Sequence, residues 1–115
     1  MEKFTFSPQV KQALDNHAPV VALESTVITH GLPHPTNYET AFAMEQEVIK
    51  RNAIPATICM LEGQFHIGIS NQQLQDLSIV SNSIKISRKD IAFALANRQN
   101  GGTTVSGTMT VANSA

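Results

Sequence analysis

Segments with the pattern of β-strands alternate along this chain with segments that have the pattern of α-helices, and this alternation limits the fold more than any other feature. Apolar and β-branched residues predict strands over 19–28, 56–61, 64–69 and 83–87. Glu62-Gly63 predicts a tight turn between the second and third of these strands, and therefore a β-hairpin. Strands that alternate with helices and include a hairpin predict an α/β fold with three layers, α/β/α, around a mixed sheet.

Helix starts are marked by capping residues. Ser7-Pro8 has the residue types preferred at a cap and a first turn, and Thr36 and Glu39 have the spacing of a capping box. Further helices are expected after Ser70 and from Lys89. The tail, residues 103–115, is ambiguous: its β-branched content favours a strand, whereas its position after a glycine pair suits the start of a helix.

Composition limits the class of protein. The 115 residues are enough for one ordinary domain, and 42% of them are apolar, so the chain can bury a real core. Only 15% are charged, which fits a chain that buries much of its surface inside a larger fold or against other subunits. The formal net charge of −1 indicates neither nucleic acid nor a membrane surface as a partner.

The single cysteine, Cys59, leaves no pair for an intramolecular disulfide and suits a reducing cytoplasm. It lies within an apolar strand, so we expect a small core residue rather than a nucleophile. No stretch approaches the roughly 20 apolar residues that a membrane helix needs, and the first residues lack the apolar region of a secretory signal. A cytoplasmic location is therefore predicted.

Glu24 lies in the middle of the apolar segment predicted to form the first strand, where burial makes a charge expensive. In one interpretation burial keeps the carboxyl protonated, which makes Glu24 a general acid oriented by neighbouring hydroxyl groups on Ser25, Thr26 and Thr29. In the other interpretation the carboxylate points to a polar edge, or an arginine or backbone amides hold it. The residue pattern alone leaves the two interpretations even.

Other polar residues carry weaker signals. His30 and His34 are separated by Gly and Pro and cannot share a helix face, so the wall of a pocket is a better interpretation than a metal site. Lys85, between two isoleucines, is either an outward-facing lysine, which the pattern favours, or an anion contact at a strand end. The stretch N-G-G-T-T-V-S at 100–106 resembles a phosphate-cradling turn, although a glycine-rich connector is at least as common.

Four blocks of the sequence, taken together, resemble the pseudouridine-5′-phosphate glycosidase family, also called the indigoidine synthase A-like family. The blocks are V-A-L-E-S-T-V-I-T-H-G-L-P-H-P from residue 21, I-P-A-T-I from 54, K-I-S-R-K-D at 85–90 and G-G-T-T-V-S-G-T-M at 101–109. They occur in the family's order and with its spacing. The resemblance extends from about Pro8 to Met109.

This resemblance implies a reaction, the reversible cleavage of the C–C glycosidic bond of pseudouridine 5′-phosphate to uracil and ribose 5-phosphate. In the family a lysine forms a Schiff base with the opened sugar. Glu24 matches the family's proton donor, Lys85 matches a substrate-binding lysine, and Val105 matches a position whose backbone contacts the substrate. Thr104 and Ser106, on either side of Val105, are expected to support the residues that contact the substrate. The resemblance also implies a manganese cofactor and a homotrimer.

The resemblance further implies that residues 1–115 are the N-terminal part of a single glycosidase domain. The family's metal-binding aspartate, glycine-rich substrate loop and Schiff-base lysine follow the last matched block, so no metal ligand is expected in this chain. We therefore expect the α/β/α fold to be incomplete and the chain alone to be inactive. Two alternatives stay open: a related sugar-phosphate or nucleoside lyase on the same scaffold, and a catalytically inactive remnant that persists as a binding partner.

Overall fold

Residues 4–115 are described by the computed structural model of this chain. In chain order they form β1 (Phe4–Phe6), α1 (Pro8–Asp15), β2 (Val20–Leu23), the π-helical turn η1 (Val27–Gly31), α2 (Thr36–Lys50), β3 (Ile54–Leu61), β4 (Gln64–Ile67), α3 (Asn71–Ile79), β5 (Ile84–Ile86), the 3-10 turn η2 (Arg88–Asp90), α4 (Ile91–Ala96), β6 (Gly101–Thr103) and α5 (Val105–Ser114).

The sheet is mixed, as predicted. Its strands lie in the order β1, β4, β3, β6 and β5, and β2 joins the first half of β3. β3 and β4 form the predicted antiparallel hairpin, whose turn residues Glu62 and Gly63 both have positive φ. β3 is also antiparallel to β6, whereas β1 and β4, β2 and β3, and β5 and β6 form parallel pairs.

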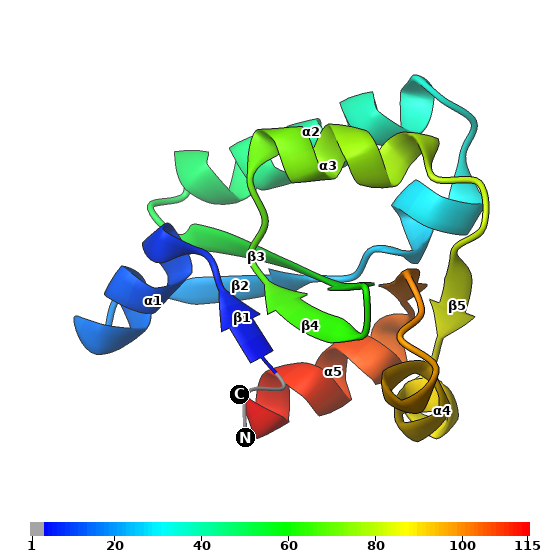
Figure 1. Cartoon of the computed structure of the whole chain (residues 1–115). Helices are drawn as coiled ribbons and strands as arrows, with labels where there is room; N and C mark the ends of the chain where they lie inside the picture. Colours follow the sequence, from blue (N-terminus) through cyan, green and yellow to red (C-terminus); the bar gives the residue numbers. More distant parts are fainter. Residues whose placement is uncertain (1–3) are drawn as a thin grey trace.

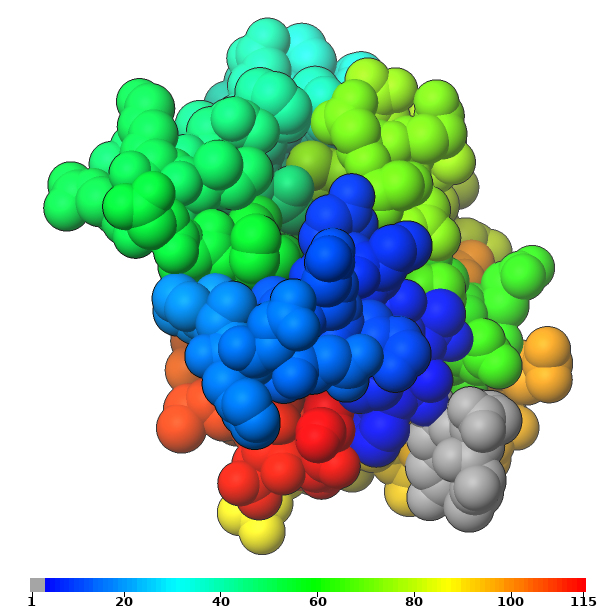
Figure 2. All heavy atoms as spheres, turned by 90° about the vertical axis from the view of Figure 1, so that its left-hand side faces the viewer, coloured from blue at the N-terminus to red at the C-terminus, as the bar shows by residue number. Residues whose placement is uncertain are grey.

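Both faces of β3 are covered, which gives the fold its three layers. Ile58 and Met60 belong to one buried cluster, to which α1, α4 and α5 contribute. Cys59 points to the other face and packs with η1, α2 and α3. Figure 1 shows α2 and α3 on one side of the sheet and α4 and α5 on the other. Seen from the end that carries β1 and α1, α5 lies on one side of these elements and α2 and α3 lie on the other (Figure 2).

β2 and β6 meet end to end along one edge of β3. β2 runs parallel to β3, and its last residue, Leu23, pairs with Thr57. β6 runs antiparallel to β3, so its carboxyl end approaches that of β2. At the junction the backbone N–H of Ser25 donates to the carbonyl of Thr103 over 3.0 Å. Since β5 is parallel to β6, the carboxyl ends of three strands gather in one place.

β2 is shorter and more exposed than the sequence predicts. The strand expected over 19–28 ends at Leu23, and the following residues turn into η1. Val21 is 40% exposed, so this strand is not covered on both faces. The apolar pattern does not reveal this break, because Val27 and Ile28 are as apolar as strand residues. Ile28 is buried in the core, but it belongs to η1 and not to a strand.

The predicted helix starts are confirmed at Ser7 and Ser70, which cap α1 and α3 with their side chains. The capping box predicted at Thr36 and Glu39 is wrong, because Thr36 is already helical and Pro35 precedes it as the cap. The tail, residues 103–115, is mainly helical: α5 begins at Val105, and only Thr103 belongs to a strand, β6. In the described part of the chain, every helix is too short or too polar to cross a membrane.

Candidate active site

The junction of β2, β5 and β6 brings together the segments that carry the predicted site residues. Glu24 directly follows β2, Thr104 and Val105 directly follow β6, and Lys85 lies in β5. Lys85 is in register with Gly102 of β6. Ile86 is buried on the face that α4 and α5 cover, so Lys85, its neighbour in the strand, points to the opposite face, where η1 lies.

Glu24 is held at the start of η1 by backbone donors. Its carboxylate accepts hydrogen bonds from the N–H of Thr26, over 3.0 Å, and from the N–H of Val27, over 3.4 Å. The side chain is half-buried, at a strand end rather than inside a covered strand. The burial on which the protonated form was predicted is therefore smaller than expected. Of the two interpretations left open, backbone amides do hold the carboxylate, and the half-buried side chain remains accessible from solvent.

The neighbouring hydroxyl groups have different tasks from those predicted. Ser25 is fully buried; its hydroxyl donates to the Ile58 carbonyl and accepts from the Thr103 N–H over 2.8 Å. The Thr103 hydroxyl also donates to Ile58 and contacts the Thr108 hydroxyl at 2.7 Å. Ser25 thus joins β2, β3 and β6 instead of orienting the Glu24 side chain. Thr26 orients Glu24 through its backbone N–H alone.

The Lys85 side chain is exposed, and in the described residues its ammonium group has neither an ion pair nor a hydrogen bond. η2 follows it closely, and the Arg88 N–H donates to the Ser106 hydroxyl over 3.2 Å, which fixes η2 against the first turn of α5. The carboxylate of Asp90 is held by Ser87 and not by a cation. The Ser87 hydroxyl and N–H donate to its carboxylate and lower the pKa of Asp90.

The glycine pair at 101–102 is part of β6 and not of a loop, so the predicted phosphate-cradling turn is wrong in its first half. A side chain at Gly102 would collide with the Thr29 hydroxyl, which explains why β6 has a glycine at the position where it packs against η1. The second half is a helix start: Thr104 caps α5 and accepts from the Gly107 N–H over 3.2 Å. Val105, the first residue of α5, is 65% exposed. Unpaired N–H groups at such an end favour an anion.

The two histidines do not meet as metal ligands. The Thr29 hydroxyl contacts Nδ1 of His30 at 2.7 Å, and the Ser78 hydroxyl contacts Nδ1 of His34 at 3.3 Å. Across residues 4–115, no three side chains of His, Cys, Asp or Glu come together as a metal-binding group. Burial raises the pKa of Cys59 to about 12, so this thiol behaves as the predicted core residue.

A large hollow lies elsewhere in the described chain. It measures about 700 Å³, and none of Glu24, Lys85 and Val105 lines it. Two of its lining residues, Glu45 and His66, were missed as candidates because each looks ordinary in sequence: an acid on a polar helix and a polar residue in an alternating strand. Only the fold shows that α2 and β4 bring them into one hollow.

Comparison with known proteins supports the sequence-based family. The chain matches the family model described as "Indigoidine synthase A like protein" over residues 9–115. Pseudouridine-5′-phosphate glycosidase of Mycoplasmopsis agalactiae is 49% identical over 93% of this chain and 36% of its own length. The enzyme of the same name from Dinoroseobacter shibae is 52% identical, over 90% of this chain and 34% of its own length.

A solved structure, that of the prealnumycin C-glycosynthase AlnA in complex with ribulose 5-phosphate, has the same fold. It superposes with a TM-score of 0.85 and 34% identity, over 99% of this chain and 36% of that chain. This chain thus spans about a third of the length of the curated relatives that it matches. The family match covers nearly all of the chain, the four sequence blocks lie within it, and the mixed α/β sheet agrees with the solved fold. The chain therefore belongs to the indigoidine synthase A like family.

Proposed function

We propose that this chain supplies the proton donor and part of the sugar-phosphate site of a pseudouridine-5′-phosphate glycosidase. The observation that carries the proposal is the meeting of three strand ends. They bring Glu24, the β5 lysine and the start of α5 to one place, although these segments are far apart in the sequence. The relatives named above act, by their names, on pseudouridine 5′-phosphate, and AlnA binds ribulose 5-phosphate, another five-carbon sugar phosphate.

In this proposal Glu24 donates a proton to the ring oxygen of the ribose when the sugar ring opens. The backbone N–H groups of Thr26 and Val27 hold the carboxyl in place, while its partial exposure leaves it accessible to a substrate. Cleavage then breaks the bond between C1′ of the sugar and C5 of the base, C5 takes up a proton, and water supplies the remaining atoms of ribose 5-phosphate. A lysine nitrogen bound to C1′ forms the C=N bond of a Schiff base as the C–C bond breaks, and the ring of the protonated base takes up the electron pair. Water then hydrolyses the Schiff base and releases the lysine.

The substrate's phosphate is proposed to lie near Lys85 and the first turn of α5. Lys85 offers an ammonium group with no partner in the described residues, and the capped end of α5 offers backbone N–H groups beside Val105. Because the Arg88 N–H binds Ser106, η2 keeps further cationic side chains close to this end. A doubly charged phosphate gains from each of these contacts.

Further properties of the complete enzyme are also part of the proposal. We infer a manganese cofactor, a homotrimer and a cytoplasmic location, which fits a charged nucleotide substrate. The described residues hold no group of three metal ligands, so they do not by themselves form a site for this ion. The Schiff-base lysine is likewise proposed to lie in the part of the relatives that this chain does not span.

The proposal is tested by completing the domain. A chimera joins this chain to the portion of the Mycoplasmopsis agalactiae enzyme that follows the matched region, and uracil release is followed by chromatography. We expect release from pseudouridine 5′-phosphate and none from uridine 5′-phosphate, whose base is linked through nitrogen. Faster release from uridine 5′-phosphate would support the alternative, a related nucleoside lyase. Failure with both nucleotides, in a folded chimera, would support the inactive remnant.

A further inference from the structure

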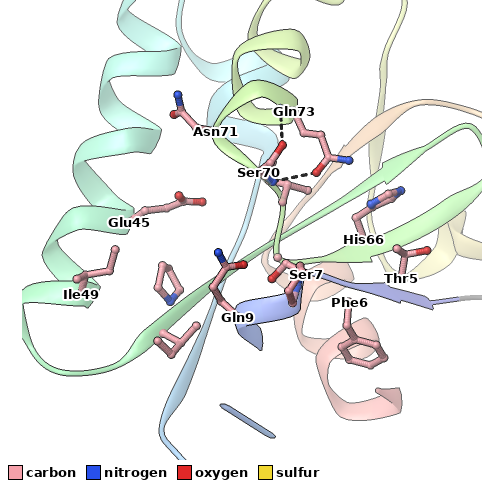
Figure 3. A pocket seen from close by; sticks show the side chains of 15 residues that line it. Thr5, Phe6, Ser7, Gln9, Glu45, Ile49, His66, Ser70, Asn71 and Gln73 are labelled. Carbon is pink, nitrogen blue, oxygen red and sulfur yellow. Dashed lines mark hydrogen bonds between the residues drawn. The ribbon is translucent and has the colours of Figure 1, made fainter. Parts of the chain in front are cut away.

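The hollow of about 700 Å³ lies on the same face of the sheet as Lys85 but at its other end. A row of register partners runs across this face from Lys85 through Gly102 and Cys59 to His66, and His66 lines the hollow. The walls come from β1, α2 and β4 and from the starts of α1, β3 and α3, as Figure 3 shows. The surface is indented where α1, α2 and α3 approach one another (Figure 2).

The walls of this pocket are mostly apolar. Ile49, Ile54, Pro55 and Ile69 line it, and Ile49 is 47% exposed although it is large and apolar. A volume of about 300–1,000 Å³ with apolar walls and a few converging polar groups is typical of small-molecule sites. The pocket therefore has the size and the walls to hold the body of a small organic molecule.

Its polar groups have free hydrogen-bonding capacity. Glu45 extends into the pocket from α2, and one of its carboxylate oxygens, Oε2, accepts from the Thr57 hydroxyl over 2.5 Å. The other oxygen has no hydrogen-bond partner among residues 4–115, and neither has the ring of His66. The Gln73 side chain uses only its oxygen, which accepts from the Ser70 N–H over 2.9 Å, so its NH₂ group is available.

The charges that line the pocket favour a cationic ligand. Glu45, from α2, and His66, from β4, are its ionisable groups; the lining residues of β1, α1, β3 and α3 are all uncharged. In the described lining no lysine or arginine balances the carboxylate. Burial raises the pKa of Glu45 and lowers the pKa of His66, so a neutral imidazole faces a carboxylate that has been partly removed from water. The Glu45 carboxylate would repel an anionic ligand, whereas a cationic ligand would supply the positive charge that the lining lacks.

We propose that this pocket binds a small organic cation, an ammonium group on an apolar body. The ammonium would donate to the free oxygen of Glu45, and the body would lie against Ile49, Ile54 and Pro55. The uncharged His66 ring accepts a further N–H donor from the ligand. This site is separate from the one proposed for the nucleotide, and it can be occupied whether or not that proposal holds.

A set of three indole compounds that differ mainly in charge tests the proposal on the full 115-residue chain. Tryptamine is cationic, tryptophol is neutral and indole-3-propionate is anionic, and isothermal titration calorimetry at pH 7.5 gives their dissociation constants. We expect tryptamine to bind roughly tenfold more tightly than tryptophol, since a hydrogen bond between charged groups is stronger than one between a charged and a neutral group. Indole-3-propionate should bind more weakly than both.

Variants assign the preference to one carboxylate. Glu45→Gln keeps an acceptor for Thr57 but removes the charge, so tryptamine and tryptophol should then bind about equally. Glu47→Gln is the matched control on the same helix, because Glu47 is exposed and pairs with Lys50 and Arg51 instead of facing the pocket. It should leave the preference unchanged. Binding of tryptamine to the wild-type chain should weaken as the pH falls, because Glu45 gains a proton and His66 gains a charge.

The proposal is overturned if tryptophol or indole-3-propionate binds to the wild-type chain as tightly as tryptamine does. It is also overturned if Glu45→Gln, with an unchanged circular dichroism spectrum, retains the full preference for the cation. The comparison among the three ligands needs no variant, so it decides the question even if Glu45→Gln does not fold.

Discussion

At the scale of single residues, Ser25 and Glu24 are adjacent but lie in different environments. Ser25 is fully buried and its hydroxyl links β2, β3 and β6, whereas its neighbour Glu24 remains partly exposed at the end of β2. The position of Glu24 therefore depends on Ser25, because the same junction fixes both the strand end and the turn that binds the carboxylate.

Replacing Ser25 with alanine should lower the free energy of unfolding by about 1–3 kcal/mol, because the buried Thr103 N–H loses its side-chain acceptor. Urea unfolding followed by circular dichroism measures this change. Ser114→Ala is the control, since its exposed hydroxyl binds a carbonyl of its own helix, and it should change stability by less than about 0.5 kcal/mol. Equal effects of the two substitutions would mean that the junction does not stabilise the fold.

His66 predicts a pH dependence of stability. Burial lowers the pKa of His66 below its ordinary value of 6.5, so the unfolded chain binds a proton more readily than the folded chain. The free energy of unfolding contributed by this group is therefore fully present above that pH and falls as the pH drops below it. Unfolding of the wild-type chain and of His66→Gln at a series of pH values should show a smaller acid loss in the variant.

Glu45 makes the opposite contribution to stability as the pH falls. Its pKa is raised, so protonation relieves the cost of burying its charge. The difference between the wild-type chain and His66→Gln removes that contribution, which both share. Substitution of the exposed His17 by asparagine, which tolerates the positive φ found there, is the control. If the free energy of unfolding falls equally with pH in His66→Gln and in the wild-type chain, His66 is not the group that causes the loss of stability in acid.

At the scale of elements, most local signals predict the structure, with the capping box at Thr36 and Glu39 as an exception, whereas non-local pairing is not visible in the sequence. The hairpin at Glu62-Gly63 and the caps at Ser7 and Ser70 depend on neighbouring residues, so the sequence displays them directly. The break after β2 and the pairing of Gly101–Thr103 depend on each other across nearly eighty positions, which no local pattern reveals. The candidate site residues could be named from the sequence, but their position at three strand ends required the fold.

Gly68 joins β4 to the loop before α3 and packs against α1. Its φ is +85°, and a Cβ there would lie 2.6 Å from Cγ2 of Val10. Gly68→Ala should therefore destabilise the chain through both backbone strain and overpacking, by about 1–3 kcal/mol. Gly31→Ala is the matched control, because the nearest atom to its added Cβ is 3.6 Å away. Thermal unfolding of both variants measures the difference, and similar midpoints would contradict this packing.

At the scale of the whole molecule, the chain has a three-layer fold and a candidate acid, but it spans only 36% of the glycosidase relative from Mycoplasmopsis agalactiae. In the proposal, the nucleophilic lysine for carbon–carbon cleavage belongs to the remaining part of such a protein. The purified 115-residue chain should therefore release no uracil from pseudouridine 5′-phosphate, while the chimera with the completed domain should. Release by the chain alone would show that a lysine of this chain serves as the nucleophile.

The most direct test of the central claim uses Glu24 in that chimera. Glu24→Gln keeps a side chain that accepts the Thr26 N–H but cannot donate the proton, and we expect kcat for uracil release to fall by about 10²–10⁴. Glu39→Gln, an exposed acid in the first turn of α2, is the control and should leave kcat unchanged. If Glu24→Gln turned over pseudouridine 5′-phosphate as fast as the unsubstituted chimera, Glu24 would not be the proton donor.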